Sequence, residues 1–418
     1  MNQTDFLIRF AAPEEPLDME SYRRMGGYTG LKTAMDMEPE GVVDVIDASR
    51  LAGRGGAGVA AGFKWGTVPR GELSYIVCNA DEGEPGTFKD RFLMEEAPYL
   101  VLEGMTIAAY AVGAAEGFIY VRGEYPAAIA QFEEAVERAR KEGFLGHRIL
   151  GRDFDFEVHV KKGGGSYVVG DETALLNSLM GNRGYPLHKP PYPTEHGLWD
   201  RPTLVNNVET LSCVPLILAK GAEWFAGIGA EKTPGPKLYP VSGHVAEPGV
   251  YEFPMGVTVG ELMEAAGGVS GSLKAVQIGG TAGPIYDAGA VDYALDFTSM
   301  RGVGGSLGSG AVVVMNSSVS MAHVLEVTTR FFAEESCGQC FGCRYGTRQL
   351  DYMARRIATG SGSIEYLDAI RKIATIMHDT SFCPFGQSVA LPLNTLLDNF
   401  GEEIADFITQ QQYLKEVV

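Results

Sequence analysis

Four of the six cysteines in this 418-residue sequence are the residues best placed to do chemistry. Cys337, Cys340 and Cys343 are each separated by two residues, and Cys383 comes later with a proline directly behind it. Three cysteines at this spacing can hold three corners of an iron–sulfur cubane, and a distant Cys-Pro commonly supplies the fourth thiolate. The pattern predicts a 4Fe-4S cluster. Structural zinc is the alternative, although zinc sites usually take their ligands as two separated pairs.

The residues around these cysteines fit a cluster site. Gly338 and Gly342 would let the backbone approach inorganic sulfide closely. Arg344 would lie near an anionic cluster or be a simple surface residue. Cys78 lies in a strand-like pattern and Cys213 in a helical one, so both are interpreted as small buried apolar residues.

A glycine-rich string, GRGGAG, begins at Gly53 and satisfies the G-x-G-x-x-G pattern of dinucleotide-binding turns. Lys64 follows at a distance that would bring its ammonium group to a phosphate or a flavin ring. The acidic string NADEGEPG begins at Asn79, directly after a predicted strand, and open α/β sheets bind ligands at this end of their strands. A solvated acidic turn is the alternative interpretation of the second string.

A second strand–loop–helix unit covers residues 161–173, and the amide-rich start of its helix favours anions. Tyr167 would pack on a ring system or belong to the core. Asp171 and Glu172 would face a ligand or simply cap the helix that follows. Two glycine-rich units in one domain could clamp one phosphorylated cofactor between them.

The elements that must position these motifs begin with alternating strands and helices, which is typical of an α/β domain. Strands are predicted at residues 75–78, 117–121 and 154–160, and an amphipathic helix at 126–143. Five prolines predict a helix-free stretch at residues 186–202. The TPGP string at residues 233–236 is interpreted as a domain boundary.

A smaller α+β unit is predicted after this boundary, and helices follow it. The unit has strands at residues 238–241, 250–253 and 311–315 and a helix that begins with a capping box of Thr258 and Glu261. The later helices are predicted at residues 321–335, 345–357, 363–377 and 389–411.

Composition and charge exclude several classes of function. A net charge of −19 argues against nucleic acid and anionic membrane surfaces as partners, because both attract clustered Lys and Arg, and it favours proteins with basic faces. The N-terminal segment carries Asp5 and Arg9, unlike a secretory signal. The longest apolar run, residues 104–115, is too short for direct membrane insertion and is interpreted as a buried helix.

A series of motifs, in order, resembles the NADH-binding flavoprotein subunit of respiratory complex I, a module that also occurs in NAD-linked hydrogenases and formate dehydrogenases. The motifs are GRGGAG, NADEGEPGTFKDR, YVRGEYP, GDETALL, KPPYP, RPTLVNNVET, and ESCGQCFGCRYGT with SFCPFG. The resemblance covers about residues 20–400. It implies a Rossmann-like FMN- and NADH-binding α/β domain (1–232), an SLBB-type, ubiquitin-like β-grasp domain (237–320) and a C-terminal helical bundle (321–418) that carries the cluster.

The resemblance also implies site residues. NADH contacts would come from Glu84, Glu172 and Tyr192, and a carboxylate at Glu84 would accept from ribose hydroxyls and repel a 2′-phosphate, favouring NAD over NADP. The implied FMN-binding residues are Gly53, Arg54, Gly55, Lys64, Asn79, Asp81, Tyr167, Gly170, Asp171, Glu172, Val205, Asn206 and Asn207.

Four positions depart from the usual motifs of this family. Val59 and Thr67 replace aromatic residues that normally stack on the dinucleotide, which predicts weaker or differently posed NADH. Asp171 replaces a glutamate, whereas Tyr192 replaces a phenylalanine and keeps a stacking face. The lost aromatics favour a divergent branch, a soluble NAD-linked hydrogenase or formate dehydrogenase, over complex I itself.

The activity that the resemblance implies is hydride transfer from NADH C4 to FMN N5, with electrons then passing singly to the 4Fe-4S cluster. No side chain need act as acid or base. The chain lacks the extra iron–sulfur extensions of some fused relatives, so we expect a separate thioredoxin-like 2Fe-2S subunit and a larger iron–sulfur subunit. The expected location is cytoplasmic, with partner subunits providing any peripheral attachment to the inner face of the membrane. The alternative is an electron-transfer module that has lost NADH oxidation.

Overall fold

The computed structural model describes residues 2–11 and 17–417, and its first sheet has four parallel strands. Their order is β3-β2-β1-β4, with bounds β1 (Tyr75–Ala80), β2 (Glu116–Val121), β3 (Glu157–Lys162) and β4 (Thr203–Asn207). The strands predicted at residues 75–78 and 117–121 are confirmed. The strand predicted at 154–160 begins later, because Phe156 first pairs with Gly146 in an isolated antiparallel bridge.

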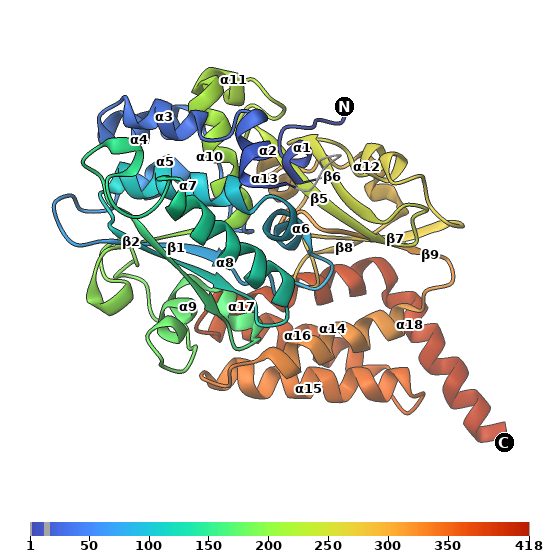
Figure 1. Ribbon diagram of the computed structural model, residues 1–418. Coiled ribbons are helices and arrows are strands. Elements are labelled where there is room, and N and C mark those ends of the chain that lie inside the picture. The colour runs from blue at the N-terminus through green and yellow to red at the C-terminus, as the bar shows by residue number, and fades with distance from the viewer. Residues whose placement is uncertain (1, 12–16, 418) are drawn as a thin grey trace.

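Helices cover both faces of this sheet (Figure 1). Ile76 and Cys78 of β1 belong to the large core formed with α7 (Pro98–Val112) and α10 (Val208–Lys220), whereas Val77 packs toward α9 (Glu172–Leu179) on the other face. Burial on both faces explains why the strands are apolar almost throughout. The interpretation of Cys78 and Cys213 as buried residues is confirmed.

Close contact between α7 and α10 requires a glycine. A Cβ added to Gly104 in α7 would lie 2.0 Å from the carbonyl oxygen of Leu211 in α10. This approach buries the apolar run at residues 104–115, which we predicted to be a buried helix and which α7 occupies as far as Val112.

The other helices of this part of the chain surround the same core. They are α1 (Ile8–Ala11), α2 (Met19–Arg24), α3 (Thr29–Met35), α4 (Pro39–Ala48), α5 (Ala61–Gly66), α6 (Lys89–Glu96), α8 (Pro126–Lys141) and α11 (Ala222–Ala226), with 3₁₀ turns η1 (Ile149–Gly151), η2 (Tyr167–Gly170) and η3 (Leu198–Asp200). The stretch predicted to be helix-free, residues 186–202, contains no α-helix; its one 3₁₀ turn, η3, has left-handed dihedrals at Trp199 and Asp200.

The second sheet is mixed, with five strands in the order β6-β5-β9-β7-β8. Its strands are β5 (Pro236–Gly243), β6 (Gly249–Pro254), β7 (Leu273–Ile278), β8 (Ile285–Asp287) and β9 (Val312–Asn316), and α12 (Val259–Ala265), η4 (Ala288–Asp292) and α13 (Phe297–Gly302) accompany them. β5, β6 and β9 confirm the predicted strands. The capping box of Thr258 and Glu261 at the start of α12 is also confirmed.

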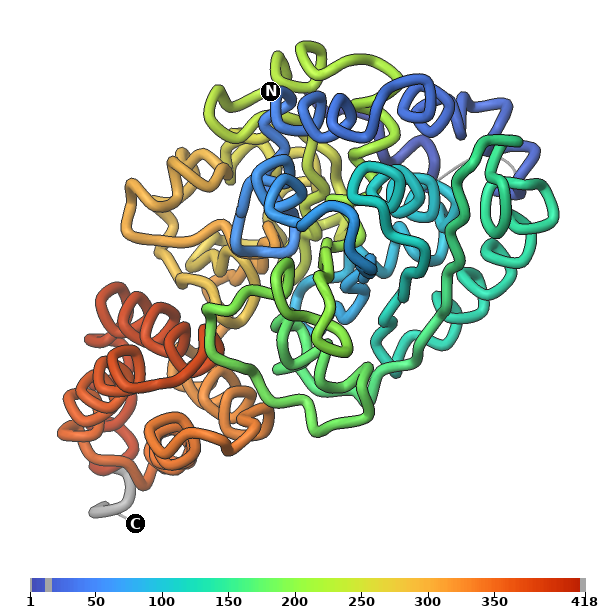
Figure 2. The backbone as a smooth tube through the Cα atoms, turned by 90° about the vertical axis from the view of Figure 1, so that its left-hand side faces the viewer, coloured from blue at the N-terminus to red at the C-terminus, as the bar shows by residue number. Residues whose placement is uncertain are grey.

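The C-terminal helices pack together on one side of the molecule (Figures 1 and 2). They are α14 (Met321–Glu335), α15 (Phe341–Ala358), α16 (Glu365–Thr380), α17 (Pro384–Ser388) and α18 (Ala390–Val417). α14 matches its predicted bounds, but α15 begins earlier than residue 345, because Cys340 is the residue that precedes its first turn. None of the helices in the described ranges has both the length and the apolar character of a membrane span.

Candidate functional site

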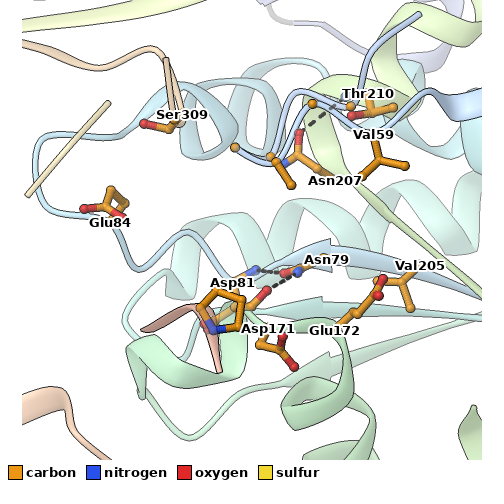
Figure 3. A pocket seen from close by; sticks show the side chains of 18 of the residues that line it. Val59, Asn79, Asp81, Glu84, Asp171, Glu172, Val205, Asn207, Thr210 and Ser309 are labelled. Carbon is orange, nitrogen blue, oxygen red and sulfur yellow. Dashed lines mark hydrogen bonds between the residues drawn. The ribbon is translucent and has the colours of Figure 1, made fainter. Parts of the chain in front are cut away.

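A cavity of about 1010 Å³, here called the central cavity, lies at the carboxyl ends of β1 and β4. Loops of the second sheet and the start of α17 complete its wall. Figure 3 shows Asn79, Asp81 and Glu172 on one side and Val59, Asn207 and Ser309 on the other. The cavity brings together all the predicted cofactor-binding residues except Arg54: Gly53, Gly55, Lys64, Asn79, Asp81, Glu84, Tyr167, Gly170, Asp171, Glu172, Tyr192, Val205, Asn206 and Asn207.

The glycine-rich loop after Gly53 forms one wall of the central cavity. The Gly53 amide donates to the carbonyl of Val59 at 2.8 Å, which closes the loop. A Cβ on Gly55 would lie 3.1 Å from Cβ of Asn207, so a larger residue would push the loop away from the end of β4. The loop therefore lines the cavity close to the start of α10, and a glycine-rich loop beside a helix start suits a phosphate group.

Arg54 turns away from the central cavity. Its fully buried guanidinium donates to the carbonyls of Pro234 at 2.8 Å and Pro236 at 3.0 Å, while its backbone amide donates to the Thr210 hydroxyl. Its side chain thus joins the loop to the start of the second sheet.

Asp81 presents an unpaired carboxylate to the central cavity. The side chain is buried, and neither of its oxygens has a hydrogen-bond partner among the described residues. Burial raises the pKa of Asp81 to about 7, with Glu124 and Glu335 adding to the effect of burial and Arg122 opposing it. A buried acceptor without a donor fits a ligand that brings hydroxyl groups, such as the ribityl chain of a flavin.

Glu172, by contrast, is paired with two lysines. Its Oε2 lies 2.6 Å from Nζ of Lys64 and its Oε1 lies 2.9 Å from Nζ of Lys189. Burial opposes ionisation of Glu172, but Lys64 and Lys189 together hold its pKa below the usual value. Asp171 caps α9 by accepting from the amides of Thr173 and Ala174, so it both caps the helix and lines the cavity.

A network of buried charges forms part of the cavity wall, where Lys89 and Asp90 line the cavity and ion pairs join them to Glu209 and Lys237. Nζ of Lys89 lies 2.7 Å from Asp90 and 2.9 Å from Glu209, and Nζ of Lys237 lies 3.2 Å from the same Glu209 oxygen. Asn207 donates to the other oxygen of Asp90 at 2.6 Å. Burial lowers the pKa of Lys237 to about 8, although Glu209 opposes that shift. Lys89, Asp90 and Glu209 lie in two of the motifs quoted above and Lys237 does not. We missed the network, because it forms only through tertiary contacts.

Glu84 and three aromatic or apolar residues also line the central cavity. Glu84 accepts from the Tyr167 hydroxyl and, at 3.0 Å, from the Ala282 amide of the second sheet, and burial raises its pKa. Phe63 also lines the cavity with 67% of its side chain exposed, beside Val59 and the half-exposed Tyr192. We missed Phe63; the available signal was an aromatic residue four positions in sequence from both Val59 and Thr67.

The four motif cysteines, here called the cysteine corner, come together where α14, α15 and α17 meet. Cys340 and Cys383 directly precede α15 and α17, and a Cβ on Gly386 would lie 3.1 Å from Cβ of Cys343. Cys343 and Cys383 are buried, whereas Cys337 and Cys340 are partly exposed. Burial raises the pKa of the Cys343 thiol to about 12, and the other three thiols add to this effect.

The cysteine corner shares a wall with the central cavity, because Cys383, with Pro384 and Phe385, lines that cavity. Arg344 lies on the opposite side, where it donates to the Gly338 carbonyl at 3.3 Å. Among the described residues, no group of three or more His, Cys, Asp or Glu side chains is arranged around one metal ion. A cubane cluster distributes four thiolates over separate iron atoms.

Three family profiles match the chain: the Nuo51 FMN-binding domain at residues 46–216, the SLBB domain at 238–284, and the NADH-ubiquinone oxidoreductase-F iron–sulfur binding region at 323–406. These matches confirm the predicted fold class and the predicted cofactors, FMN and a 4Fe-4S cluster.

The similar proteins agree with these matches. The F 2 subunit of NADH-quinone oxidoreductase from Rhizobium meliloti (strain 1021) is 42% identical over 94% of this chain and 95% of its own length. NADP-reducing hydrogenase subunit HndC of Solidesulfovibrio fructosivorans is 40% identical over 93% of this chain and 80% of its own length. A crystal structure of NAD⁺-reducing [NiFe]-hydrogenase in the H₂-reduced state superposes with a TM-score of 0.84 and 33% identity, covering 96% of this chain and 66% of that one. The chain therefore belongs to the family of NADH-oxidising flavoprotein subunits found in NADH-quinone oxidoreductases and NAD-linked hydrogenases.

Proposed function

We propose that the central cavity holds FMN, that the cysteine corner holds the 4Fe-4S cluster through Cys337, Cys340, Cys343 and Cys383, and that the chain moves electrons between NADH and partner iron–sulfur subunits. The observation that carries this proposal is the position of Cys383, which lines the cavity and belongs to the corner. When bound, the flavin exchanges a hydride with NADH and single electrons with the cluster. The chain itself binds, orients and shields these groups.

The residues that would hold FMN surround the cavity floor. The carboxylate of Asp81 would accept from the ribityl hydroxyls, since it has no donor of its own. The amides of the glycine-rich loop would bind the phosphate. The Lys64 ammonium, held by Glu172, would lie against the ring system as a fixed positive charge. The full proposed set remains Gly53, Arg54, Gly55, Lys64, Asn79, Asp81, Tyr167, Gly170, Asp171, Glu172, Val205, Asn206 and Asn207, with Arg54 acting through its backbone.

NADH would enter through the mouth of the cavity, between Glu84 and Tyr192. For Glu84 to accept from the ribose hydroxyls it would exchange its bond to Tyr167, since its other oxygen is held by the Ala282 amide. Phe63 supplies an exposed ring beside Val59 and so would restore an aromatic face that Val59 and Thr67 lack. This favours retained NADH oxidation over a module that has lost it.

The partners are proposed from the same relatives. Subunits of a hydrogenase and of NADH-quinone oxidoreductases are among the proteins similar to this chain, so we infer a thioredoxin-like 2Fe-2S subunit and a larger iron–sulfur subunit as partners. A soluble NAD-linked hydrogenase or formate dehydrogenase, or complex I, would provide that setting. The proposed location is cytoplasmic, with partner subunits providing any contact with the inner face of the membrane.

The test is an anaerobic titration of the purified chain loaded with FMN. NADH should bleach the flavin absorbance and NADPH should not, because Glu84 would repel a 2′-phosphate. Flavin that dithionite reduces and NADH does not would overturn the proposal of NADH oxidation in favour of the electron-transfer module. Iron and acid-labile sulfide are measured on the same sample, and zinc without sulfide would overturn the cluster assignment.

A further inference from the structure

Two serine residues, Ser336 and Ser381, lie beside the cysteine corner without belonging to its proposed iron ligands. Ser336 directly precedes Cys337, and Ser381 lies two residues before Cys383, so the pair flanks the first and the last of the four cysteines. Ser336 is partly exposed, whereas Ser381 is only 7% exposed. We assigned no role to either serine from the sequence.

The Ser336 hydroxyl contacts the sulfur of one proposed ligand. Its Oγ lies 3.3 Å from Sγ of Cys343 and accepts from the Gly338 amide at 3.4 Å. A cysteine that binds iron has lost its proton, so in the loaded corner the serine is the donor of this bond. The Gly338 amide polarises the hydroxyl in the same direction and strengthens its donation to sulfur.

The Ser381 hydroxyl, by contrast, has no partner among the described residues. The backbone of Ser381 is satisfied, because its amide donates to the Met377 carbonyl at 2.9 Å and its carbonyl accepts from the Gln387 side chain at 3.1 Å. A buried hydroxyl without an acceptor is costly, and it marks a place where a bound group completes the site. The cysteine corner is adjacent, since a Cβ on Gly386 would meet both the Ser381 hydroxyl oxygen and Cβ of Cys343.

A local structural role is the alternative for Ser336. A serine that accepts from the amide two residues later often serves only to shape a turn, and Ser336 is the residue that ends α14. The contact with Cys343 goes beyond that turn, because seven residues separate the two side chains. The orphan hydroxyl of Ser381 is a second observation, made on a different segment, that points to the same corner.

Hydrogen bonds at this corner affect how readily it accepts electrons. Four thiolates make a loaded corner anionic, and each electron that arrives adds one more negative charge. Cys343 and Cys383 are buried, so solvent stabilises that added charge poorly. A hydroxyl that donates to a sulfur atom therefore stabilises the reduced form more than the oxidised form, and the reduction potential rises.

We propose that the hydroxyls of Ser336 and Ser381 donate hydrogen bonds to sulfur atoms of the loaded cysteine corner, Ser336 to Cys343 and Ser381 to a sulfur beside Gly386, and that they raise the reduction potential of the cluster. Both are positioning residues that act on electron transfer through sulfur. This inference rests on the proposed cluster. Iron and sulfide content test the cluster itself, whereas its midpoint potential tests the serines, so the two failures are distinguishable.

The first experiment measures the midpoint potential of the cluster in the full chain, by a reductive titration followed by EPR of the reduced cluster. Ser336→Ala and Ser381→Ala should each weaken the reduced form about tenfold relative to the oxidised form, which lowers the midpoint of a one-electron couple by about 59 mV. Iron and sulfide content should equal wild type, since neither serine binds iron. Ser336→Thr keeps the hydroxyl and should retain the wild-type midpoint.

Thr347→Val is the matched control for these variants. Thr347 is buried beside the same cysteine, but its hydroxyl donates to the backbone carbonyl of Cys343 at 2.8 Å and not to the sulfur. The loss of this hydroxyl should leave the midpoint unchanged. A wild-type midpoint in either alanine variant would overturn the role of that serine, and an equal shift in Thr347→Val would overturn the role of both.

The second experiment begins with the unsubstituted chain. ENDOR spectra of its reduced cluster are recorded after preparation in H₂O and in D₂O. A proton donated to a sulfur atom couples to the cluster spin and exchanges with solvent, so strong proton couplings should disappear in D₂O. Ser336→Ala should lack one of these couplings already in H₂O. A wild-type spectrum without exchangeable couplings contradicts the proposal, and a chain that holds zinc without sulfide contradicts the cluster as well.

Discussion

The central cavity and the cysteine corner share a wall, yet they are built in opposite ways. In the cavity two carboxylates, Asp171 and Glu172, are paired with Lys64 and Lys189. In its wall two more, Asp90 and Glu209, are paired with Lys89 and Lys237. In the corner, burial and the neighbouring thiols raise the pKa of Cys343 to about 12, and only the hydrogen bond with Ser336 opposes them. A site with internally balanced charges is prepared before its ligand arrives, whereas buried thiols become stable ligands only when metal replaces their protons.

This contrast predicts that the corner is the more fragile of the two sites. Cys343→Ser should abolish the bound cluster, because one corner iron loses its thiolate and the buried site offers no other soft ligand. Iron and acid-labile sulfide should fall to near zero while FMN remains bound. Cys213→Ala, which removes a buried thiol in α10, is the control and should keep full iron content. Wild-type iron in Cys343→Ser would remove this residue from the cluster.

The buried charge network in the cavity wall tests whether paired charges stabilise the cavity before a ligand binds. Glu209→Gln leaves Lys89 and Lys237 buried with less compensating charge, and breaking a buried ion pair typically costs about 3–5 kcal/mol. The urea midpoint should fall accordingly. Glu137→Gln, which breaks an exposed pair with Lys141, should change stability by less than about 1 kcal/mol. Similar shifts for both variants would show that the buried network does not stabilise the cavity wall.

Asp81 is the exception within the cavity, since none of the described residues donates a hydrogen bond to it. It predicts a pH dependence of the flavin-free protein. Its folded pKa of about 7 lies above the ordinary carboxyl value of about 3.9, so the folded chain holds the extra proton between these values. The stability that this proton contributes is present below pH 4 and is lost as pH rises through 7. Asp81→Asn should therefore be more stable than wild type at pH 8, by roughly 4 kcal/mol.

The measurement is urea unfolding of both proteins at pH 5 and pH 8. The advantage of Asp81→Asn should be smaller at pH 5, because wild-type Asp81 is then protonated in the folded state. The negative charges of Glu124 and Glu335 also raise the pKa of Asp81, and both residues are present in wild type and in the variant. An advantage that does not change with pH would mean that Asp81 is ionised throughout.

The cysteine corner was easier to predict than the central cavity, because more of its residues lie close together in the sequence. Three of the four cluster cysteines lie within one short stretch of sequence, so the cysteine corner could be predicted from that stretch. Both ends of α14 were predicted from the periodicity of that helix alone. The start of β3 was not, because the bridge between Phe156 and Gly146 joins separate segments. The domain limits 1–232, 237–320 and 321–418 and the individual site residues remain predictions.

The cavity was harder to predict because its charges pair across the fold. Lys189 meets Glu172 from the proline-rich stretch, and Lys237 meets Glu209 from the second sheet, so no window of sequence contains either pair. Arg54 sits in a recognisable loop, yet carbonyls of a distant segment hold its side chain. The glycine pattern predicted a loop that does line the cavity, but tertiary contacts decide that the Arg54 side chain points away from it.

The smallest expected effect is at the mouth of the cavity, where Phe63 would substitute for the aromatic residues missing at Val59 and Thr67. Phe63→Ala should raise KM for NADH about fivefold with little change in kcat, because a base stacked on an aromatic ring gains about 1 kcal/mol or more and the reacting atoms lie elsewhere. Phe63→Tyr keeps the ring and should restore the wild-type KM. Steady-state kinetics with ferricyanide as acceptor measure both constants without a partner subunit. If Phe63→Ala leaves KM unchanged, the dinucleotide binds without this ring, and the cavity mouth is adapted to a different pose.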